Sequence, residues 1–433
     1  MQPLKPPGSL RLKPEWPWPE RWSQSGCQPG PQSSPRSRPV THFGLLLLAL
    51  AAPAHLPAQT KPPCGGDFAS WRDGIVTEAR AAGISEPSIG LLADIAPNPK
   101  VLARDRSQSV FTQDWLTFAG RMVSANRLTI GRKQLAKQAG SFARAEQTYG
   151  VPGPVIAAFW GLETDYGAVQ GDFDTLSALA TLSHDCRRPA LFRPQLIDAL
   201  RLVDLGWLRR DELRGAWAGE LGQVQLLPSD YLKFGTDGDG DGEVHLKNDN
   251  ADVIQTAARY VAHLGWRAGE PWLEEVRVPD ELPWQRAGTY QRERRAQWAA
   301  WGVRRADGSE LPADGLSAAL LLPMGRKGPA FLAYPNFDIY LDWNQSLVYT
   351  TTAAYFATRL AGAPKVRAGS PEPGLNAAQM KQLQQRLRDR GHDVGKIDGI
   401  LGAKTREAVR IEQQRLGLPA DAWPTPGLLS RLN

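Results

Sequence analysis

No apolar run in the 433-residue chain approaches the roughly 20 residues that a membrane-spanning helix needs. The chain also lacks a basic stripe interleaved with aromatic residues, which argues against a nucleic-acid partner. With hydrophobic residues at 42% and charged residues at 22%, the composition is ordinary for a globular protein. Fibrous, wholly disordered and multi-span membrane proteins are therefore excluded, and the length suits about three domains of roughly 150 residues.

Proline and positive charge are concentrated at the N-terminus. Residues 1–63 hold 14 of the 35 prolines and a net charge of +5 out of the chain's +6. Within them GLLLLALA (44–51) follows Arg36 and Arg38 and precedes Ala52-Pro53-Ala54, the order of a secretory signal. We therefore predict that residues 1–63 are a disordered leader with a signal peptide, and that the protein is exported, soluble and periplasmic. Because the run starts late, the segment before it would reflect a misassigned translation start or an unusual extension. The alternative to a signal peptide is a disordered tail with a chance leucine run.

Three cysteines are present, so at most one disulfide can form within the chain. If the leader is removed, Cys27 is lost with it and Cys64 and Cys186 remain. In an oxidising compartment this pair could form one disulfide. Two free thiols are the alternative.

Amphipathic patterns with apolar residues three and four apart predict a mainly helical body. The predicted helices cover 68–84, 109–128, 133–150, 252–266 and 345–362. The segment 155–162 (VIAAFWGL) is apolar on every side, which predicts a buried helix. Residues 271–330 are irregular, with short strands expected at 274–278 and 319–323.

The C-terminal part divides into a linker and a small unit. Residues 363–373 are rich in Pro, Gly and Ala, which is typical of a linker. Residues 374–433 contain two clear helical patterns, 380–390 and 404–417. The predicted domains are thus 1–63, a catalytic body at 64–362, the linker, and this unit.

Glu163 ends the buried apolar segment, in the string FWGLETDYG. A carboxyl group removed from water favours its neutral form and can deliver a proton to a leaving oxygen, as a general acid does. A capping or salt-bridged glutamate is the alternative. Asp165 is two residues further on and faces away on a helix, so the two do not form an obvious glycosidase pair.

Four separated strings carry a more specific signal: GVPGPVIAAFWGLETDYG, HDCRRPALFRPQL, GAWAGELGQVQLLPSDY and FLAYPNFDIYLDWNQSLVY. In order and spacing they resemble the lytic murein transglycosylase B family. The resemblance implies a lysozyme-like all-α domain with small irregular or β insertions. It also implies non-hydrolytic cleavage of the bond between N-acetylmuramic acid and N-acetylglucosamine in peptidoglycan.

By this resemblance Glu163 matches the single catalytic acid/base. It would protonate the glycosidic oxygen and then accept a proton from the muramoyl C6 hydroxyl, which closes a 1,6-anhydro ring. Positions matching the sugar subsites of the family are Arg188, Gln225, Tyr260, Asn344 and Tyr349. Each of these five also suits an ordinary structural role, and the chain departs from some members by Leu191 in place of an aromatic residue and Ala216 in place of serine.

A second candidate site is the loop Asp237-Gly238-Asp239-Gly240-Asp241-Gly242-Glu243. Carboxylates at positions 1, 3 and 5, Gly at 6 and a backbone carbonyl at 7 suit calcium in an EF-hand loop. The bidentate Glu expected at position 12 is replaced by Asn248, so Asp252 is the candidate for closing the site. The family resembled also carries such a loop here, and the predicted Ca²⁺ role is structural, at low affinity. A solvated Asp-Gly turn is the alternative. The predicted metal ligands are Asp237, Asp239, Asp241, Glu243 and Asp252.

The C-terminal unit resembles the small, three-helix peptidoglycan-binding domain, on the core DG-x-x-G-x-x-T-R-x-A-V at 398–409. Its net charge of +4 suits a polymer bearing carboxylates, although a solvated basic helix would look the same. We therefore predict an exported, monomeric lytic transglycosylase with peptidoglycan strands as its partner and no catalytic cofactor. A hydrolytic muramidase and a non-catalytic wall-binding protein are the rival interpretations.

Overall fold

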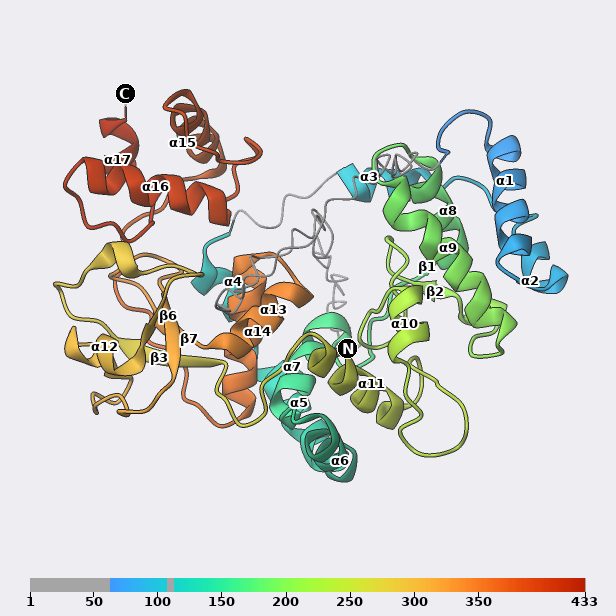
Figure 1. The fold of residues 1–433 in the computed structure, drawn as a ribbon, viewed down its shortest axis with the longest axis horizontal. Coiled ribbons are helices and arrows are strands. Elements are labelled where there is room, and N and C mark those ends of the chain that lie inside the picture. The colour runs from blue at the N-terminus through green and yellow to red at the C-terminus, as the bar shows by residue number, and fades with distance from the viewer. Residues whose placement is uncertain (1–62, 107–112, 433) are drawn as a thin grey trace, which may run out of the picture.

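The computed structural model describes residues 63–106 and 113–432, so the predicted signal peptide lies outside the described residues. Within the described part, no helix is both long and apolar enough to cross a bilayer. The catalytic body is mainly helical, as predicted (Figure 1). Its helices are α1 (Phe68–Ala81), α2 (Glu86–Gly90), α3 (Pro99–Arg106), α4 (Trp115–Met122), α5 (Ala125–Lys137), α6 (Ala139–Tyr149), α7 (Gly153–Thr164), α8 (Thr175–His184), α9 (Pro189–Asp204), α10 (Pro228–Phe234), α11 (Asn250–His263), α12 (Arg295–Ala300), α13 (Pro335–Trp343) and α14 (Leu347–Leu360).

Helix α7 forms the centre of this body, and all but one of its residues are buried. It packs against α5, α6, α11 and α14. Gly161 makes the packing on α14 close, because a Cβ atom there would lie 2.6 Å from the Tyr166 ring and 3.0 Å from Phe356. The predicted buried helix at 155–162 is therefore confirmed, and α7 holds the end of that segment in a fixed position.

The helix predicted over 109–128 is wrong as a single element. The structure ends α4 at Met122 and begins α5 at Ala125. Ser124 separates them, since its side chain caps α5 by accepting a hydrogen bond from the backbone N–H of Arg127 (3.2 Å). A serine in a run of helical periodicity favours a cap because its hydroxyl competes for backbone donors.

The irregular region 271–330 contains most of a five-stranded antiparallel sheet with the order β4-β6-β7-β3-β5. Its strands are β3 (Leu273–Arg277), β4 (Arg292–Arg294), β5 (Arg304–Arg305), β6 (Ser317–Leu321) and β7 (Ala330–Ala333), and a separate pair is formed by β1 (Phe173–Asp174) and β2 (Arg214–Gly215). The two predicted strands correspond to β3 and β6. The sheet has a hydrophobic core of its own, around Trp298, Leu320 and Tyr334.

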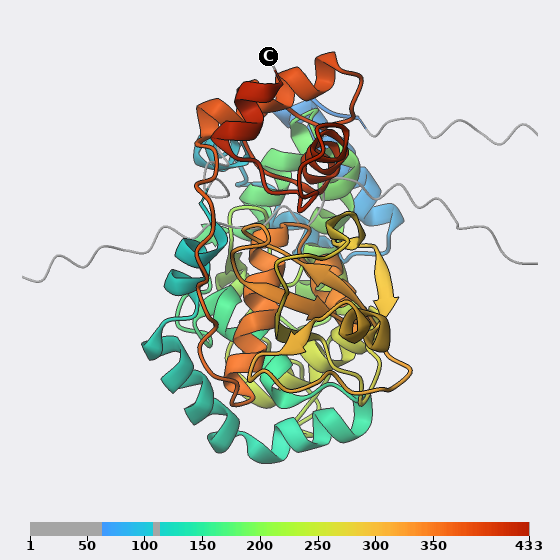
Figure 2. The ribbon, with the colours of Figure 1, turned by 90° about the vertical axis from the view of Figure 1, so that its left-hand side faces the viewer.

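The C-terminal unit has three helices, α15 (Ala377–Asp389), α16 (Ala403–Arg415) and α17 (Pro426–Arg431), around a third small core. It lies against the loops at one end of the sheet (Figure 2). Arg406 of α16 donates to the carbonyl oxygens of Leu322 (3.4 Å) and Pro323 (2.8 Å). Asp421 accepts from the backbone N–H of Arg326 (3.0 Å). The unit is thus docked on the catalytic body.

The predicted linker has no helix or strand, but it is held along its length. The Arg367 side chain pairs with Glu275 of β3 (3.0 Å), and the N–H of Ser370 donates to the carbonyl of Lys327 (2.8 Å). The carboxylate of Glu372 pairs with the Lys327 side chain (2.7 Å). In Figure 2 this segment runs up one side of the molecule to the C-terminal unit.

Candidate active site

Glu163 lies in the last turn of α7 and is buried, with 3% of its surface exposed. One carboxylate oxygen, Oε1, accepts a hydrogen bond from Trp343 Nε1 (2.7 Å) and another from the Tyr349 hydroxyl (2.8 Å). The donors come from the end of α13 and the start of α14. Two donors on one oxygen fix the orientation of the carboxyl group, because each constrains a different direction.

An aromatic shell surrounds this carboxyl group. The Trp343 ring stacks on Phe159 of α7, with centroids 4.1 Å apart and an interplanar angle of 22°. The Tyr260 ring of α11 also lies against Trp343, with centroids 5.3 Å apart and an interplanar angle of 59°. Tyr260 is therefore connected to Glu163 through the tryptophan that binds it.

Asp165 does not join Glu163, in agreement with the expectation from sequence. It caps α7 in a left-handed conformation (φ 51°), and its carboxylate pairs with Arg127 Nε of α5 at 2.6 Å. The chain reverses here, so Asp165 points to α5.

Asn344 occupies the turn between α13 and α14 and is fully buried. Its Oδ1 accepts from the N–H of Ser346 (2.9 Å), and its carbonyl accepts from the Thr350 hydroxyl (2.6 Å). Its Nδ2 has no hydrogen-bond partner within the described residues. The amide thus shapes the turn that carries Tyr349 and keeps one donor group for another acceptor.

Gln225 lies in a tight turn, Gly222–Leu226, with a left-handed φ of 53°. Its Nε2 donates to the carbonyls of Gly222 (2.8 Å) and Gln170 (3.1 Å), while its Oε1 is buried without a partner in the described part of the chain. The same turn is attached to α7, because Gln223 accepts from Trp160 Nε1 (2.8 Å). The turn that carries Gln225 is therefore anchored to α7 through Gln223.

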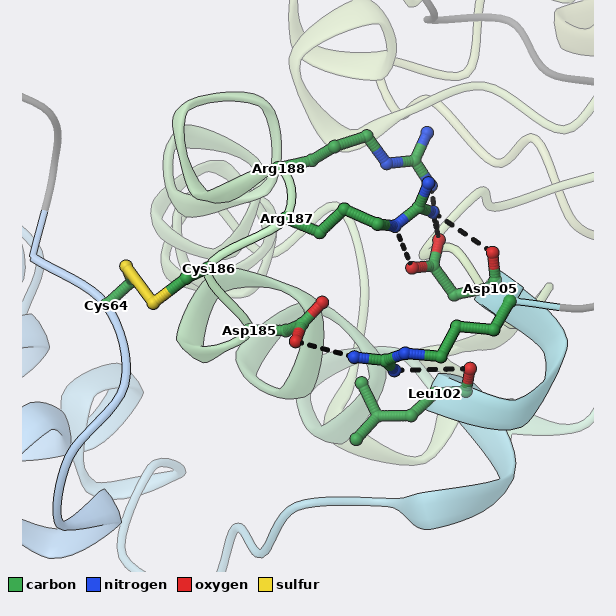
Figure 3. Close-up of polar contacts among 8 residues, drawn as sticks. Cys64, Leu102, Asp105, Asp185, Cys186, Arg187 and Arg188 are labelled. Carbon is green, nitrogen blue, oxygen red and sulfur yellow. Dashed lines mark hydrogen bonds and ion pairs between the residues drawn. A yellow bond between two sulfur atoms is a disulfide. The ribbon is translucent and has the colours of Figure 1, made fainter. Parts of the chain in front are cut away.

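Arg188 lies apart from this group, at the N-terminal cap of α9. It shares the buried carboxylate of Asp105 with Arg187 (Figure 3). Its guanidinium lies over the Phe192 ring, 4.9 Å from the centroid. Next to it Cys186 forms a disulfide with Cys64, with Cα atoms 5.3 Å apart. The predicted cysteine pairing is confirmed.

The acidic loop places three of its five predicted ligands together. Oxygens of Asp237, Asp239 and Asp252 lie within 4.8 Å of one another. The carboxylate of Asp252 also accepts from the N–H groups of Gly238 (2.7 Å) and His245 (2.6 Å), and burial raises the pKa of this carboxyl group.

The other two predicted ligands make local contacts. Asp241 accepts from the N–H of Glu243 (2.9 Å), and the Glu243 carboxylate pairs with His245 Nε2 (2.6 Å), which raises the histidine pKa. Buried and exposed oxygens converging at this spacing fit the oxygen ligands that Ca²⁺ prefers. Gly238 lets the loop approach α11, since a Cβ atom there would lie 2.3 Å from the carbonyl of Ala251.

Trp343 and Asp105 are the residues at these sites that sequence reasoning missed. Trp343 directly precedes Asn344 in the motif already recognised, so its position was visible although its hydrogen bond to Glu163 was not.

A cavity of about 480 Å³ lies between the C-terminal unit and the sheet, and Leu347 and Thr351 of α14 line it. Neither Glu163 nor Tyr349 is among its lining residues.

Comparison with family models gives two matches. Residues 67–358 match the transglycosylase SLT domain, and residues 376–432 match a putative peptidoglycan-binding domain. Among curated proteins, the membrane-bound lytic murein transglycosylase B of Escherichia coli (strain K12) is 32% identical over 162 residues. That match covers 36% of this chain and 43% of the relative, so the chain spans less than half of that relative's length.

Solved structures extend the match. SltB3 from Pseudomonas aeruginosa, in complex with NAG-anhNAM-pentapeptide, is 36% identical with a TM-score of 0.79, covering 85% of this chain and all of that one. The Escherichia coli lytic transglycosylase Slt35, in complex with calcium, is 26% identical with a TM-score of 0.60, covering 69% of this chain and 95% of that one. These matches confirm the predicted lysozyme-like helical fold with its C-terminal module. The chain belongs to the family of lytic transglycosylases that carry the transglycosylase SLT domain.

Proposed function

We propose that this protein cleaves the glycosidic bond between N-acetylmuramic acid and N-acetylglucosamine in peptidoglycan without water, and leaves 1,6-anhydro-muramoyl ends. The observation that carries the proposal is the buried Glu163 carboxyl group, oriented by Trp343 and Tyr349. The complex of the similar SltB3 with NAG-anhNAM-pentapeptide supports the same product class.

In this mechanism Glu163 acts twice. Its protonated carboxyl group donates to the glycosidic oxygen, and the bond from that oxygen to the muramoyl anomeric carbon breaks. The resulting carboxylate accepts the proton of the muramoyl C6 hydroxyl, whose oxygen bonds to the anomeric carbon. The proton balance closes, and one carboxyl group suffices because the substrate supplies the nucleophile.

The donors to Oε1 have a defined task in this cycle. Between the two proton transfers Glu163 carries a negative charge in a buried place, which is costly unless hydrogen bonds compensate it. Trp343 and Tyr349 supply two such bonds. They also hold the carboxyl group in one orientation for both transfers.

The remaining predicted residues are assigned to substrate binding. Gln225 Oε1 and Asn344 Nδ2 have no hydrogen-bond partner in the described part of the chain, and both atoms are buried, so they would meet sugar hydroxyls only after a local rearrangement on binding. Sugar rings present hydroxyl edges and apolar faces, which suits polar groups beside aromatic rings such as Tyr260 and Tyr349. Arg188 supplies a positive charge from the N-terminal cap of α9.

Product mass tests this function. Purified sacculi are digested with the parent and with Glu163→Gln, and the released muropeptides are analysed by mass spectrometry. Anhydro products are lighter by one water than the reducing-end products of a hydrolytic muramidase, so the two reactions are distinguished directly. A Glu163→Gln variant as active as the parent would refute the proposed role of Glu163. A parent that releases no muropeptides would favour a non-catalytic wall-binding protein.

A structural calcium ion belongs to the same proposal. Asp237, Asp239 and Asp252 would hold it, with Asp241 and the carbonyl of Glu243 completing the loop. Support comes from the convergence of three carboxylates and from the similar Slt35, whose structure is a complex with calcium. The ion would tie the loop to α11 and take no part in catalysis.

We place the enzyme in the periplasm, exported by the leader at 1–63 and bound to peptidoglycan strands through the module at 374–433. Support comes from the predicted signal sequence, from the matched peptidoglycan-binding domain and from the disulfide, which is typical of oxidising compartments. N-terminal sequencing of the protein from the cell envelope tests the export. A sequence beginning at Met1 would contradict it.

A further inference from the structure

Two arginines share one buried carboxylate where α3 meets the connection between α8 and α9. Asp105 lies at the end of α3 with only 1% of its side chain exposed. Its Oδ1 contacts both Arg187 Nη2 and Arg188 Nη2, and its Oδ2 accepts from Arg187 Nε at 2.6 Å. Since guanidinium groups stay charged, one carboxylate compensates one of them and the pair keeps a net positive charge.

The Arg188 guanidinium is held in place by Asp105 and Phe192, but not all of its N–H groups have hydrogen-bond partners among the described residues. Asp105 takes only its Nη2 group, and the guanidinium plane lies over the Phe192 ring at 4.9 Å. Its Nε is buried and has no hydrogen-bond partner in the described part of the chain. The guanidinium therefore has a set direction, and the 20% of the Arg188 side chain that is exposed is the part that a ligand can reach.

The opposite side of the same short segment is tied covalently. Cys186 directly precedes the arginines and bonds to Cys64, away from Asp105 (Figure 3). The N–H of Gly65 donates to the carbonyl of His184 (2.8 Å), and His184 Nε2 lies 3.1 Å from the carbonyl of Gly66. On the side of α3, next to Asp105, Arg106 also pairs with Asp185 (2.9 Å).

Residues 185–188 connect α8 to α9 in four residues, and both of their sides are fixed. Such a connection would otherwise open locally at low free-energy cost, as loops do. Two like charges held together would also separate if the carboxylate between them were removed. The position of Arg188 thus depends on groups that lie far from it in the sequence.

We propose that Asp105 and the Cys64–Cys186 disulfide form a two-sided clamp that positions Arg188 for substrate, and that opening the disulfide weakens substrate binding without slowing the chemical step at Glu163. The assignment rests on the proposed function. Opening requires a thiol reductant, which is oxidised to its own disulfide while Cys64 and Cys186 become thiols. Asp105 and both cysteines are positioning residues, since they act through Arg188.

The test measures KM and kcat on soluble, uncross-linked peptidoglycan strands, with anhydro-muropeptide release as the readout. The variants are Asp105→Asn, the double variant Cys64→Ser/Cys186→Ser, Arg188→Ala, and each of the first two combined with Arg188→Ala. Glu86→Gln is the matched control, because Glu86 lies in α2 and the substitution breaks only an exposed ion pair with Arg80 (2.6 Å). Each protein is checked for a cooperative thermal transition.

The clamp predicts a KM about tenfold higher for Asp105→Asn, which corresponds to about 1.4 kcal/mol, and a several-fold higher KM for the double serine variant. In both, kcat stays within about twofold of the parent. In proteins that already carry Arg188→Ala, neither Asp105→Asn nor the double serine change raises KM further, because the clamp acts through that residue. Reductant reproduces the serine effect in the parent and leaves the double serine variant unchanged. Glu86→Gln behaves as the parent.

Unchanged KM in the folded serine variant, or a fall in kcat alone, overturns the clamp. If Asp105→Asn does not fold, the serine variant and the reductant experiment decide. If the parent releases no anhydro product, the proposed function fails separately. Hydrogen exchange at residues 183–192 then judges the clamp, and exchange no faster in the variants than in the parent overturns it.

Discussion

Replacing Tyr349 by phenylalanine removes one of the two donors to Glu163 Oε1 and leaves the ring in place. The hydroxyl lies 2.8 Å from the oxygen and is buried, so no bulk water replaces it. Hydrogen bonds to charged groups contribute about 1.5–3 kcal/mol. If the bond is fully used when Glu163 is a carboxylate, kcat falls roughly 10- to 100-fold, at 1.36 kcal/mol per factor of ten.

The assay is release of anhydro-muropeptides from sacculi at saturating substrate. Tyr355→Phe is the matched control, because Tyr355 lies on the same helix and its hydroxyl accepts from the N–H of Val366 (3.1 Å) instead. The control should keep kcat within about twofold. If Tyr349→Phe also does, or if its loss lies wholly in KM, the donor does not serve the proton transfers and the proposed role is wrong.

Three further outcomes are expected. Calcium at ten times its Kd should stabilise the folded parent by about 1.4 kcal/mol, so millimolar calcium should raise its melting temperature. Asp239→Asn should reduce that rise. Equal rises for the two proteins in calorimetry would reject the site. Asp198→Asn should stabilise the protein at pH 7, because burial raises the pKa of Asp198 and makes its charged form unfavourable in the folded state. In the parent, the stability contributed by the neutral carboxyl group is fully present below pH 3.8 and is lost as the pH rises through the folded pKa. The melting temperatures of the two proteins should therefore converge in acid. Gly161→Ala should cost about 1–3 kcal/mol in urea unfolding, since its Cβ would meet the Tyr166 ring at 2.6 Å; parent-like stability would show that α7 can shift.

The hydrophobic pattern of short segments was enough to predict the buried helix and two of the strands. Helix α7 is apolar on every side, so its burial and the glutamate at its end follow from one short string. Strands β3 and β6 were predicted because they are apolar or alternating runs of five residues. The four-residue β7 and the two-residue β5 were not, because their pairing is decided by partners elsewhere in the sheet.

The candidate site divides in the same way. The Cys64–Cys186 bond followed from counting, since only one pair remained after the leader. The bond between Trp343 and Glu163 joins residues 180 positions apart, and Asp105 meets its arginines across 82 and 83 positions. No sequence period encodes such contacts, and only the packing of α3, α7 and α13 brings them together.

The docked C-terminal unit limits how this protein could be recombined. A domain on a free linker can be exchanged for another because few contacts join its surface to the neighbouring domain. Here Arg406 reaches the carbonyls of Leu322 and Pro323, and the Trp423 indole donates to the carbonyl of Glu372 (2.9 Å). A transplanted module would have to carry this footprint or leave backbone carbonyls of the catalytic body without donors. The two units therefore have to be exchanged together if these contacts are to be kept, although their sequences match separate families.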